Sequence, residues 1–233
     1  MLDTFEVTQI VSALRPIFLQ KQVLLLTVAE ITILASHQDG TFHGIARDKM
    51  TEEAYRKLKL WSFDSLESIH TIRGILFSTQ VMADRQTMKF CTPRNFYDPG
   101  HFLFFDFDLS TKKVKIIDSL FSSFSSSRYF CENTIRTFFS YLLRVLSFSS
   151  ETKLSKLRGF KPSVSLTRNS TPQISLECGS ISALNLILSL NNSHDYLKKY
   201  TFTDYSKCVK NIKPLLCHIL YSQTIPFDSI NEE

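Results

Sequence analysis

The sequence predicts an α+β fold, and three observations support this class. Apolar residues recur at helical spacing in residues 4–20 and again in residues 129–146. Two short apolar segments, residues 102–108 and 113–118, are separated by a short turn and therefore predict an antiparallel hairpin. The chain has 233 residues, of which 43% are hydrophobic, so it is long enough to form one large domain with a full core.

The same patterns predict the remaining elements. In chain order these are a strand or strand pair at 22–36, a helix at 51–60, a strand near 74–78, one short strand within a loop at 149–172, a helix from Cys178, and one or two helices in 193–233. Asp64 is placed to cap a short helix that contains Leu66 and Ile69.

Charge and cysteine content argue against several classes of function. The net charge of +5 is dispersed, which does not favour a nucleic-acid partner. The five cysteines are widely spaced without a CxxC pair, so we expect free thiols, no bound metal and no cofactor. Such thiols suit a reducing compartment, the cytoplasm or nucleus. The N-terminus lacks the pattern of a signal peptide, and the most apolar run, 23–35, falls short of the about 20 residues of a membrane span. We expect a monomer.

A histidine and an aspartate occupy matching positions in the predicted hairpin. His101 directly precedes its first strand, and Asp118 ends its second. If the turn is centred on Leu109 and Ser110, the two side chains are directly opposite; if it is centred one residue later, they are diagonal neighbours on the same face. In either register the carboxylate can accept a hydrogen bond from the imidazole and stabilise its cation. The spacing therefore predicts a His–Asp pair.

A cysteine stands at the start of a predicted helix in the segment TPQISLECGSISALNLILSL. The unsatisfied backbone N–H groups and the positive dipole end at a helix start lower the pKa of a cysteine there, here Cys178. Gly179 leaves room for a substrate backbone, and Gln173 can direct its amide, with the Cys178 N–H, at an oxyanion. Each residue by itself also suits a structural role. Their conjunction with His101 and Asp118 predicts a nucleophile, a base and an orienting group.

The order of these residues resembles the ubiquitin-like-protein-specific cysteine proteases, the clan of the SUMO proteases and the adenovirus protease. The resemblance lies in His101-Phe102 at a strand start, Asp118-Ser119-Leu120 at the end of the next strand, Gln173, and Glu177-Cys178-Gly179 at a helix start. Upstream, Trp61 and Asp64 in WSFD echo the family's Trp-Leu-Asn-Asp motif, and Pro93 and Asn95 match its Pro-x-Asn. The resemblance covers about residues 55–192.

The resemblance implies a papain-like clan CE fold, with a central mixed sheet flanked by helices and the nucleophile at a helix N-terminus. It implies that Trp61 and Phe102 flank the C-terminal Gly-Gly tail of a ubiquitin-like modifier, the family's substrate, although the family usually has tryptophan where Phe102 stands. The spacing from Gln173 to Cys178 is one residue shorter than in the family. We expect a catalytic core at 51–192, an N-terminal extension at 1–50 that could bind substrate, and a C-terminal helical extension at 193–233 packed on the core.

The leading interpretation is a cysteine isopeptidase that cleaves ubiquitin, SUMO or NEDD8 from conjugates after the terminal glycine. Glu-Cys-Gly also resembles the YopJ-type acetyltransferases of the same clan, which would use acetyl-coenzyme A through the same cysteine. A third interpretation is a catalytically silent binding module on this fold. The sequence leaves open which modifier is bound, and whether the protein is a host enzyme or a secreted effector that acts in a host cell.

Overall fold

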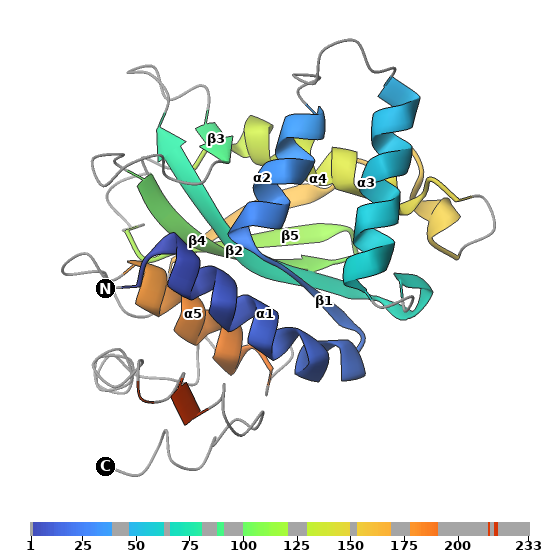
Figure 1. The fold of residues 1–233 in the computed structure, drawn as a ribbon. Coiled ribbons are helices and arrows are strands. Elements are labelled where there is room, and N and C mark those ends of the chain that lie inside the picture. Colours follow the sequence, from blue (N-terminus) through green and yellow to red (C-terminus); the bar gives the residue numbers. More distant parts are fainter. Residues whose placement is uncertain are drawn as a thin grey trace.

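The computed structural model describes residues 2–38, 47–62, 66–80, 88–90, 100–120, 130–149, 153–168, 178–190 and positions 214, 217 and 218. These residues form an α+β fold in which one mixed sheet is flanked by helices (Figure 1). The predicted class is therefore confirmed. Among the described residues, no helix is both long enough and apolar enough to cross a bilayer.

The sheet supplies the frame on which the rest of the fold is built. Its strands are β1 (Val23–Leu26), β2 (Thr71–Gln80), β3 (Met88–Phe90), β4 (Gly100–Asp108), β5 (Lys113–Asp118) and β6 (Ser163–Arg168). The order is β1-β2-β4-β5-β6, and β3 pairs with β2 beside this path. The central strands β2, β4 and β5 are antiparallel, whereas β1 and β6 pair in parallel with β2 and β5 respectively. The predicted strands at 74–78, 102–108 and 113–118 are confirmed.

Helices cover both faces of the sheet, and each face has its own apolar cluster (Figure 1). The helices are α1 (Thr4–Gln20), α2 (Val28–Gln38), α3 (Arg47–Trp61), α4 (Glu132–Leu146) and α5 (Cys178–Leu188), with 3-10 turns η1 (Leu66–Ser68) and η2 (Lys153–Leu157). α2, α3 and α4 pack on one face, where residues such as Leu103, Phe105 and Phe139 are buried. α1 and α5 pack on the other, where Phe18, Phe104 and Leu184 are buried.

The strand or strand pair predicted at 22–36 is wrong beyond residue 26, because α2 begins there. Thr27 and Glu30 form a reciprocal cap: the Glu30 N–H donates to Thr27 Oγ1 at 3.2 Å, and the Thr27 N–H donates to Glu30 Oε2 at 2.8 Å. Threonine followed three residues later by glutamate is the sequence signature of a capping box. The β-branched residues that favoured a strand are therefore accommodated in a helix with a strong start signal.

The domain boundary expected near residue 50 has no counterpart in the described fold. β1 lies in the same sheet as the hairpin, and α1 contributes to the same apolar cluster as α5. Residues 2–38 are therefore an integral part of the core, not an appendage to it. Of the C-terminal extension expected at 193–233, the structure describes only positions 214, 217 and 218, so its predicted packing lies outside the described residues.

Candidate active site

The turn between β4 and β5 fixes the register of the hairpin. The Asp108 carboxylate accepts hydrogen bonds from the Ser110 N–H at 2.8 Å and from Thr111 Oγ1 at 2.8 Å. Lys112 closes the turn in the left-handed region, with φ of 56°. Since a slip of one residue would move every side chain to the other face, this turn decides which residues meet at the far end of the hairpin.

His101 and Asp118 meet at that far end. The strands pair Phe104 with Ile117, so Asp118 is a diagonal neighbour of His101 on the same face, which is the second of the two predicted registers. His101 Nε2 lies 2.7 Å from Asp118 Oδ1, and the two side chains are 2% and 0% exposed. The Leu120 N–H donates to the same carboxylate oxygen at 2.8 Å. The buried carboxylate is thereby fixed by the backbone that follows it, and it orients the imidazole.

Cys178 is the first residue of α5, and its thiol hydrogen-bonds to the His101 imidazole. Because Nε2 of the ring is engaged by Asp118, the other ring nitrogen, Nδ1, is the one available to the thiol. The hydroxyl of Ser182, one turn along α5, donates to the Phe102 carbonyl oxygen at 3.3 Å. This contact holds the first turns of the helix on β4 beside the histidine. Cys178 is half-buried, whereas His101 and Asp118 are fully buried.

The electrostatics of this cluster favour a charged pair. Burial lowers the pKa of His101, but the hydrogen bonds and charges of Asp118 and Cys178 outweigh burial and raise it to about 9. Burial raises the pKa of the Cys178 thiol, but the hydrogen bond and charge of His101, with the backbone N–H groups of Phe102 and Gly179, lower it below its ordinary value. The two shifts together favour thiolate and imidazolium, the reactive state of a cysteine nucleophile.

Gly179 has a packing role that the sequence did not reveal. A Cβ added at this position would lie 2.9 Å from the Leu2 carbonyl oxygen and 3.3 Å from Cδ2 of Phe102. The missing side chain therefore lets the N-terminal segment approach the start of α5. The space expected for a substrate backbone is, at this carbon, taken up by Leu2 and Phe102.

Phe102 follows His101 and faces the α5 side of the sheet. Its ring is 6% exposed and packs edge-on against Phe77, with ring centroids 4.9 Å apart. One edge of the ring is turned toward Gly179. The ring thus lies next to the residue that follows Cys178, and it is part of the apolar cluster under α1 and α5.

Trp61 does not join this cluster. It ends α3 and packs, half-buried, against the apolar cluster on the opposite face of the sheet. The chain then leads into β2, whose first residue, Thr71, pairs with Asp108 at the end of β4 away from His101 (Figure 1). The role of Trp61 beside the tail of a modifier stays a prediction. Asp64 and Gln173 lie outside the described residues.

Leu2 is the neighbour of the site that the sequence analysis missed. It is 3% exposed and lies against Gly179, in the same cluster as Phe102. A signal for this position exists: Asp3 and Glu6 form a capping box at the start of α1, and an apolar residue directly before such a cap packs back on the helix. The signal predicts a buried Leu2 but not that α1 lies beside α5.

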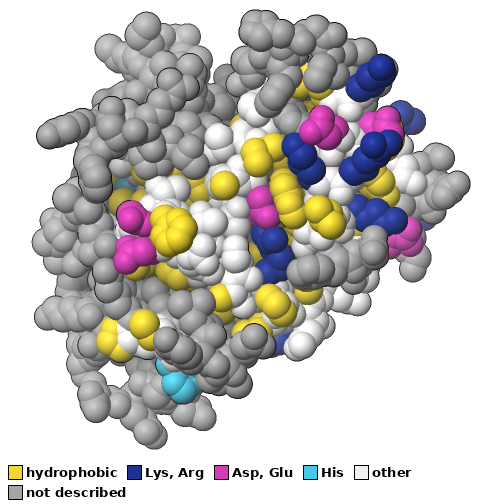
Figure 2. Space-filling view, in the orientation of Figure 1, with side chains coloured by type: hydrophobic (Ala, Val, Ile, Leu, Met, Phe, Trp, Pro, Cys, Tyr) yellow, Lys and Arg dark blue, Asp and Glu magenta, His cyan; other side chains and the backbone are white. Residues whose placement is uncertain are grey.

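The surface charges of the described residues do not gather into a strongly basic patch on the face shown in Figure 2. Lysine and arginine side chains over α3 alternate there with acidic ones. On α3, two ion pairs join residues one helical turn apart: Glu52 with Arg56, and Glu53 with Lys57. Among the described residues, no group of three or more His, Cys, Asp or Glu side chains is placed to hold a metal ion.

Comparisons with known proteins find similarity in the fold and none in the sequence. No family model matches the chain, and no curated protein sequence is significantly similar to it. Among solved structures, ChlaDub1 of Chlamydia trachomatis is 11% identical, over 94% of this chain and 92% of that chain, with a TM-score of 0.46.

Two structures of the SUMO protease Ulp1 are also similar. One, with its catalytic cysteine oxidised to a sulfonic acid, is 12% identical over 89% of this chain and 80% of that chain, with a TM-score of 0.42. The other, a complex with Smt3, the yeast ortholog of SUMO, is 13% identical over 89% and 79%, with a TM-score of 0.41.

Proposed function

We propose that this protein is a cysteine isopeptidase that removes ubiquitin or a ubiquitin-like modifier from conjugates. The observation that carries the catalytic part is the buried contact of His101 with Asp118 at 2.7 Å, together with the hydrogen bond between His101 and the Cys178 thiol. The substrate class rests on the resemblance of the motifs around these three residues to the proteases of ubiquitin-like modifiers.

In the proposed reaction the Cys178 thiolate attacks the carbonyl carbon of the modifier's terminal glycine. The C–N bond to the lysine side chain breaks, and the imidazolium of His101 gives its proton to the departing amine. Water then loses a proton to His101 and attacks the thioester carbon. The C–S bond breaks, which restores the thiolate–imidazolium pair, and the released carboxylic acid of the modifier loses its proton to solvent. Asp118 keeps the imidazole oriented and stabilises its cation through both steps.

The developing oxyanion would be bound by the Cys178 backbone N–H and the Gln173 side chain. We further propose that the ring of Phe102, next to Gly179, favours glycines at the end of the modifier, because a Cβ there would cost steric strain. The free thiol of the nucleophile suits a reducing compartment.

The test uses ubiquitin, SUMO and NEDD8 probes that carry an electrophile at the C-terminus. We expect one of them to become covalently attached to Cys178, as read from the mass of the intact protein and of the labelled peptide. Cys178→Ala should not react, whereas Cys131→Ser, which changes another free thiol of the described residues, should react like the wild type. If no probe attaches and acetyl-coenzyme A instead acylates Cys178, the isopeptidase proposal is wrong and the acetyltransferase interpretation takes its place.

A further inference from the structure

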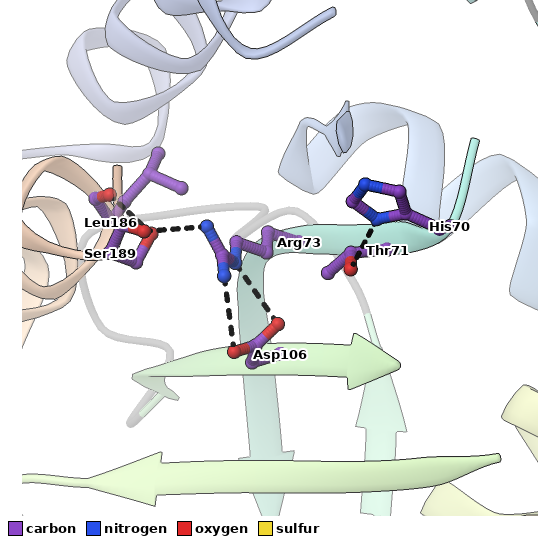
Figure 3. Close-up of polar contacts among 6 residues, drawn as sticks. All are labelled: His70, Thr71, Arg73, Asp106, Leu186 and Ser189. Atoms are coloured by element: carbon purple, nitrogen blue, oxygen red, sulfur yellow. Dashed lines mark hydrogen bonds and ion pairs between the residues drawn. The ribbon is translucent and has the colours of Figure 1, made fainter. Parts of the chain in front are cut away.

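A second buried charge pair lies on the sheet away from the site. Arg73 on β2 pairs with Asp106, its partner in the β2–β4 register, and the two side chains are 8% and 2% exposed (Figure 3). Arg73 Nε donates to Asp106 Oδ1 at 3.0 Å, and Nη2 lies 3.5 Å from Oδ2. The remaining terminal nitrogen, Nη1, donates to the Ser189 carbonyl oxygen at 2.7 Å.

Ser189 belongs to the end of the helix that carries the nucleophile. It follows Leu188, the last residue of α5, and its N–H donates to the Asn185 carbonyl oxygen at 3.0 Å. Its hydroxyl donates to the Leu186 carbonyl oxygen at 2.6 Å (Figure 3). Since a helix end leaves carbonyl groups without helical partners, a guanidinium there both satisfies a carbonyl and interacts favourably with the dipole.

The helix is therefore fastened to β4 at two points. Near its start, Ser182 bonds to the backbone of Phe102, next to His101. Past its end, Ser189 is tied through Arg73 to Asp106, five residues further along the same strand as His101. An 11-residue helix is about 16 Å long and nearly incompressible along its axis, because its hydrogen bonds repeat every turn. A displacement at Ser189 would then reach Cys178.

We propose that Arg73 is a positioning residue for the nucleophile: through Ser189 it sets the axial place of α5 on β4, so that Cys178 stays within hydrogen-bond reach of His101. This inference rests on the cysteine–histidine site of the proposed function. Asp106 holds the guanidinium in the direction of Ser189, and the guanidinium fork suits this task because separate nitrogens bond to Asp106 and Ser189. A shift of about 1 Å can cost on the order of a hundredfold in rate.

The test compares the wild type with Arg73→Met/Asp106→Leu. Replacing a buried ion pair by apolar residues of similar size is often neutral for stability, so the fold is expected to survive while the contact to Ser189 is lost. The readout is the rate of Cys178 alkylation by iodoacetamide from pH 5 to 10. Among the described residues, the charged groups that act on the thiol and its partner are His101 and Asp118.

If Cys178 is displaced from His101, a smaller fraction of the Cys178 thiol is ionised at low pH. At high pH the thiol is ionised with or without this contact. We therefore expect alkylation about tenfold slower at pH 6 and nearly unchanged at pH 10. A matched control is Arg15→Met/Glu30→Gln. The partly buried ion pair of Arg15 with Glu30 joins α1 to α2, and Arg15 also donates to the Leu25 carbonyl oxygen; neither bond involves Ser189. The control should keep the wild-type profile.

A wild-type profile in the folded Arg73→Met/Asp106→Leu variant would overturn the inference, as would an equal change in the control. If that variant does not fold, Arg73→Gln/Asp106→Asn takes its place: the two amides can pair across the strands, but glutamine is too short to bond to Ser189 as well. The same criterion applies to it. Because alkylation requires no modifier, the positioning effect can be seen even where every modifier probe fails, and a failed isopeptidase proposal stays distinguishable from a failed positioning role.

Discussion

Two buried charge pairs lie on the same strand, and they differ in what their cations can do. His101 and Asp106 are both on β4; the first pairs with a carboxylate on β5, the second with a guanidinium on β2. Both pairs are almost fully removed from water, at 2% and 0% exposed for one and 8% and 2% for the other. The His101 imidazolium, whose pKa is raised to about 9, can give up its proton, whereas a guanidinium cannot.

The partners of the two cations match this difference. His101 contacts a thiol that can give and take a proton, so its pair is suited to chemistry. Arg73 contacts a backbone carbonyl at the end of α5, so its pair is suited to holding an element in place. Burial therefore does not tell a catalytic pair from a structural one; the titration of the cation and the nature of its third contact do.

The largest effect is expected from removing the Cys178 sulfur, the reactive atom that contacts the His101–Asp118 pair. Cys178→Ala should lower cleavage of a modifier conjugate by about four powers of ten or more, because the nucleophile is lost. Alanine is small and forms helices well, so the thermal unfolding midpoint should change little. Cys131→Ser serves as control, since Cys131 is the N-cap residue of α4 but makes no side-chain capping bond, and serine is a good helix cap. A tenth or more of wild-type activity in Cys178→Ala would contradict the assignment.

Removing the charge of the first pair should have the next largest effect. Asp118→Asn keeps an acceptor for the Leu120 N–H but loses the carboxylate that stabilises the imidazolium. We expect kcat to fall by about three to four powers of ten. The pKa of His101, measured by NMR, should fall from its raised value of about 9. An unchanged kcat would show that Asp118 does not serve the reaction.

Breaking the Arg73–Asp106 pair should mainly lower the free energy of unfolding. Asp106→Ala leaves the Arg73 guanidinium buried without its carboxylate, and the loss of one partner of such a pair costs about 3–5 kcal/mol of unfolding free energy. Chemical denaturation measures this, and Asp118→Asn should cost less because it leaves the buried group hydrogen-bonded. If Asp106→Ala unfolds at the wild-type denaturant concentration, the Arg73 pair is not the structural tie that its contacts indicate.

Substitution of Phe102 tests how far the reaction depends on the shape of the side chain that follows His101. Phe102→Ala should slow cleavage of a modifier conjugate by about a hundredfold, because the scissile bond is held less closely in line. Alkylation of Cys178 should change much less, since the thiolate depends on His101 and the start of α5. Phe77→Leu, behind the same ring, controls for a general loosening of the cluster. A parallel fall of both rates in Phe102→Ala would make the ring a supporting core residue only.

The parts of the site that could be predicted from the sequence are those set by local rules. Turn length limits the hairpin to two registers, and both bring His101 and Asp118 to one face. The helix start at Cys178 follows from the apolar run behind it. The arrangement of α5 relative to His101 could not be derived in this way, because it depends on packing between segments about 80 residues apart, such as Ser182 on Phe102.

Three residues show what a short sequence pattern does not reveal about packing. Trp61 lies in a segment that echoes a family motif, yet its ring packs at the end of α3 against the apolar cluster under α2, α3 and α4. Leu2, in the segment expected to be an extension, contacts Gly179 instead. Arg73 gave no signal, since an arginine within an apolar strand shows its role only when its cross-strand partner Asp106 and the end of α5 are known.

The smallest expected effect is a difference between the pH profiles of Cys178 alkylation and of conjugate cleavage. This difference reports on the proton of His101 and requires no mutation. The pKa of Cys178 is lowered and that of His101 is raised to about 9, so thiolate and imidazolium coexist between these values. As the pH falls below the thiol pKa, both alkylation and conjugate cleavage should decrease. As it rises above about 9, His101 loses its proton while the thiolate remains.

Alkylation needs only the thiolate and should therefore stay level above that pH, whereas cleavage needs the acid for the leaving amine and should fall about tenfold per pH unit. A small free thiol, with an ordinary pKa near about 8.5, is the reference for alkylation. If alkylation of Cys178 follows that reference, or if cleavage stays level above pH 9, the imidazolium is not the proton donor and His101 has no more chemical role than Arg73.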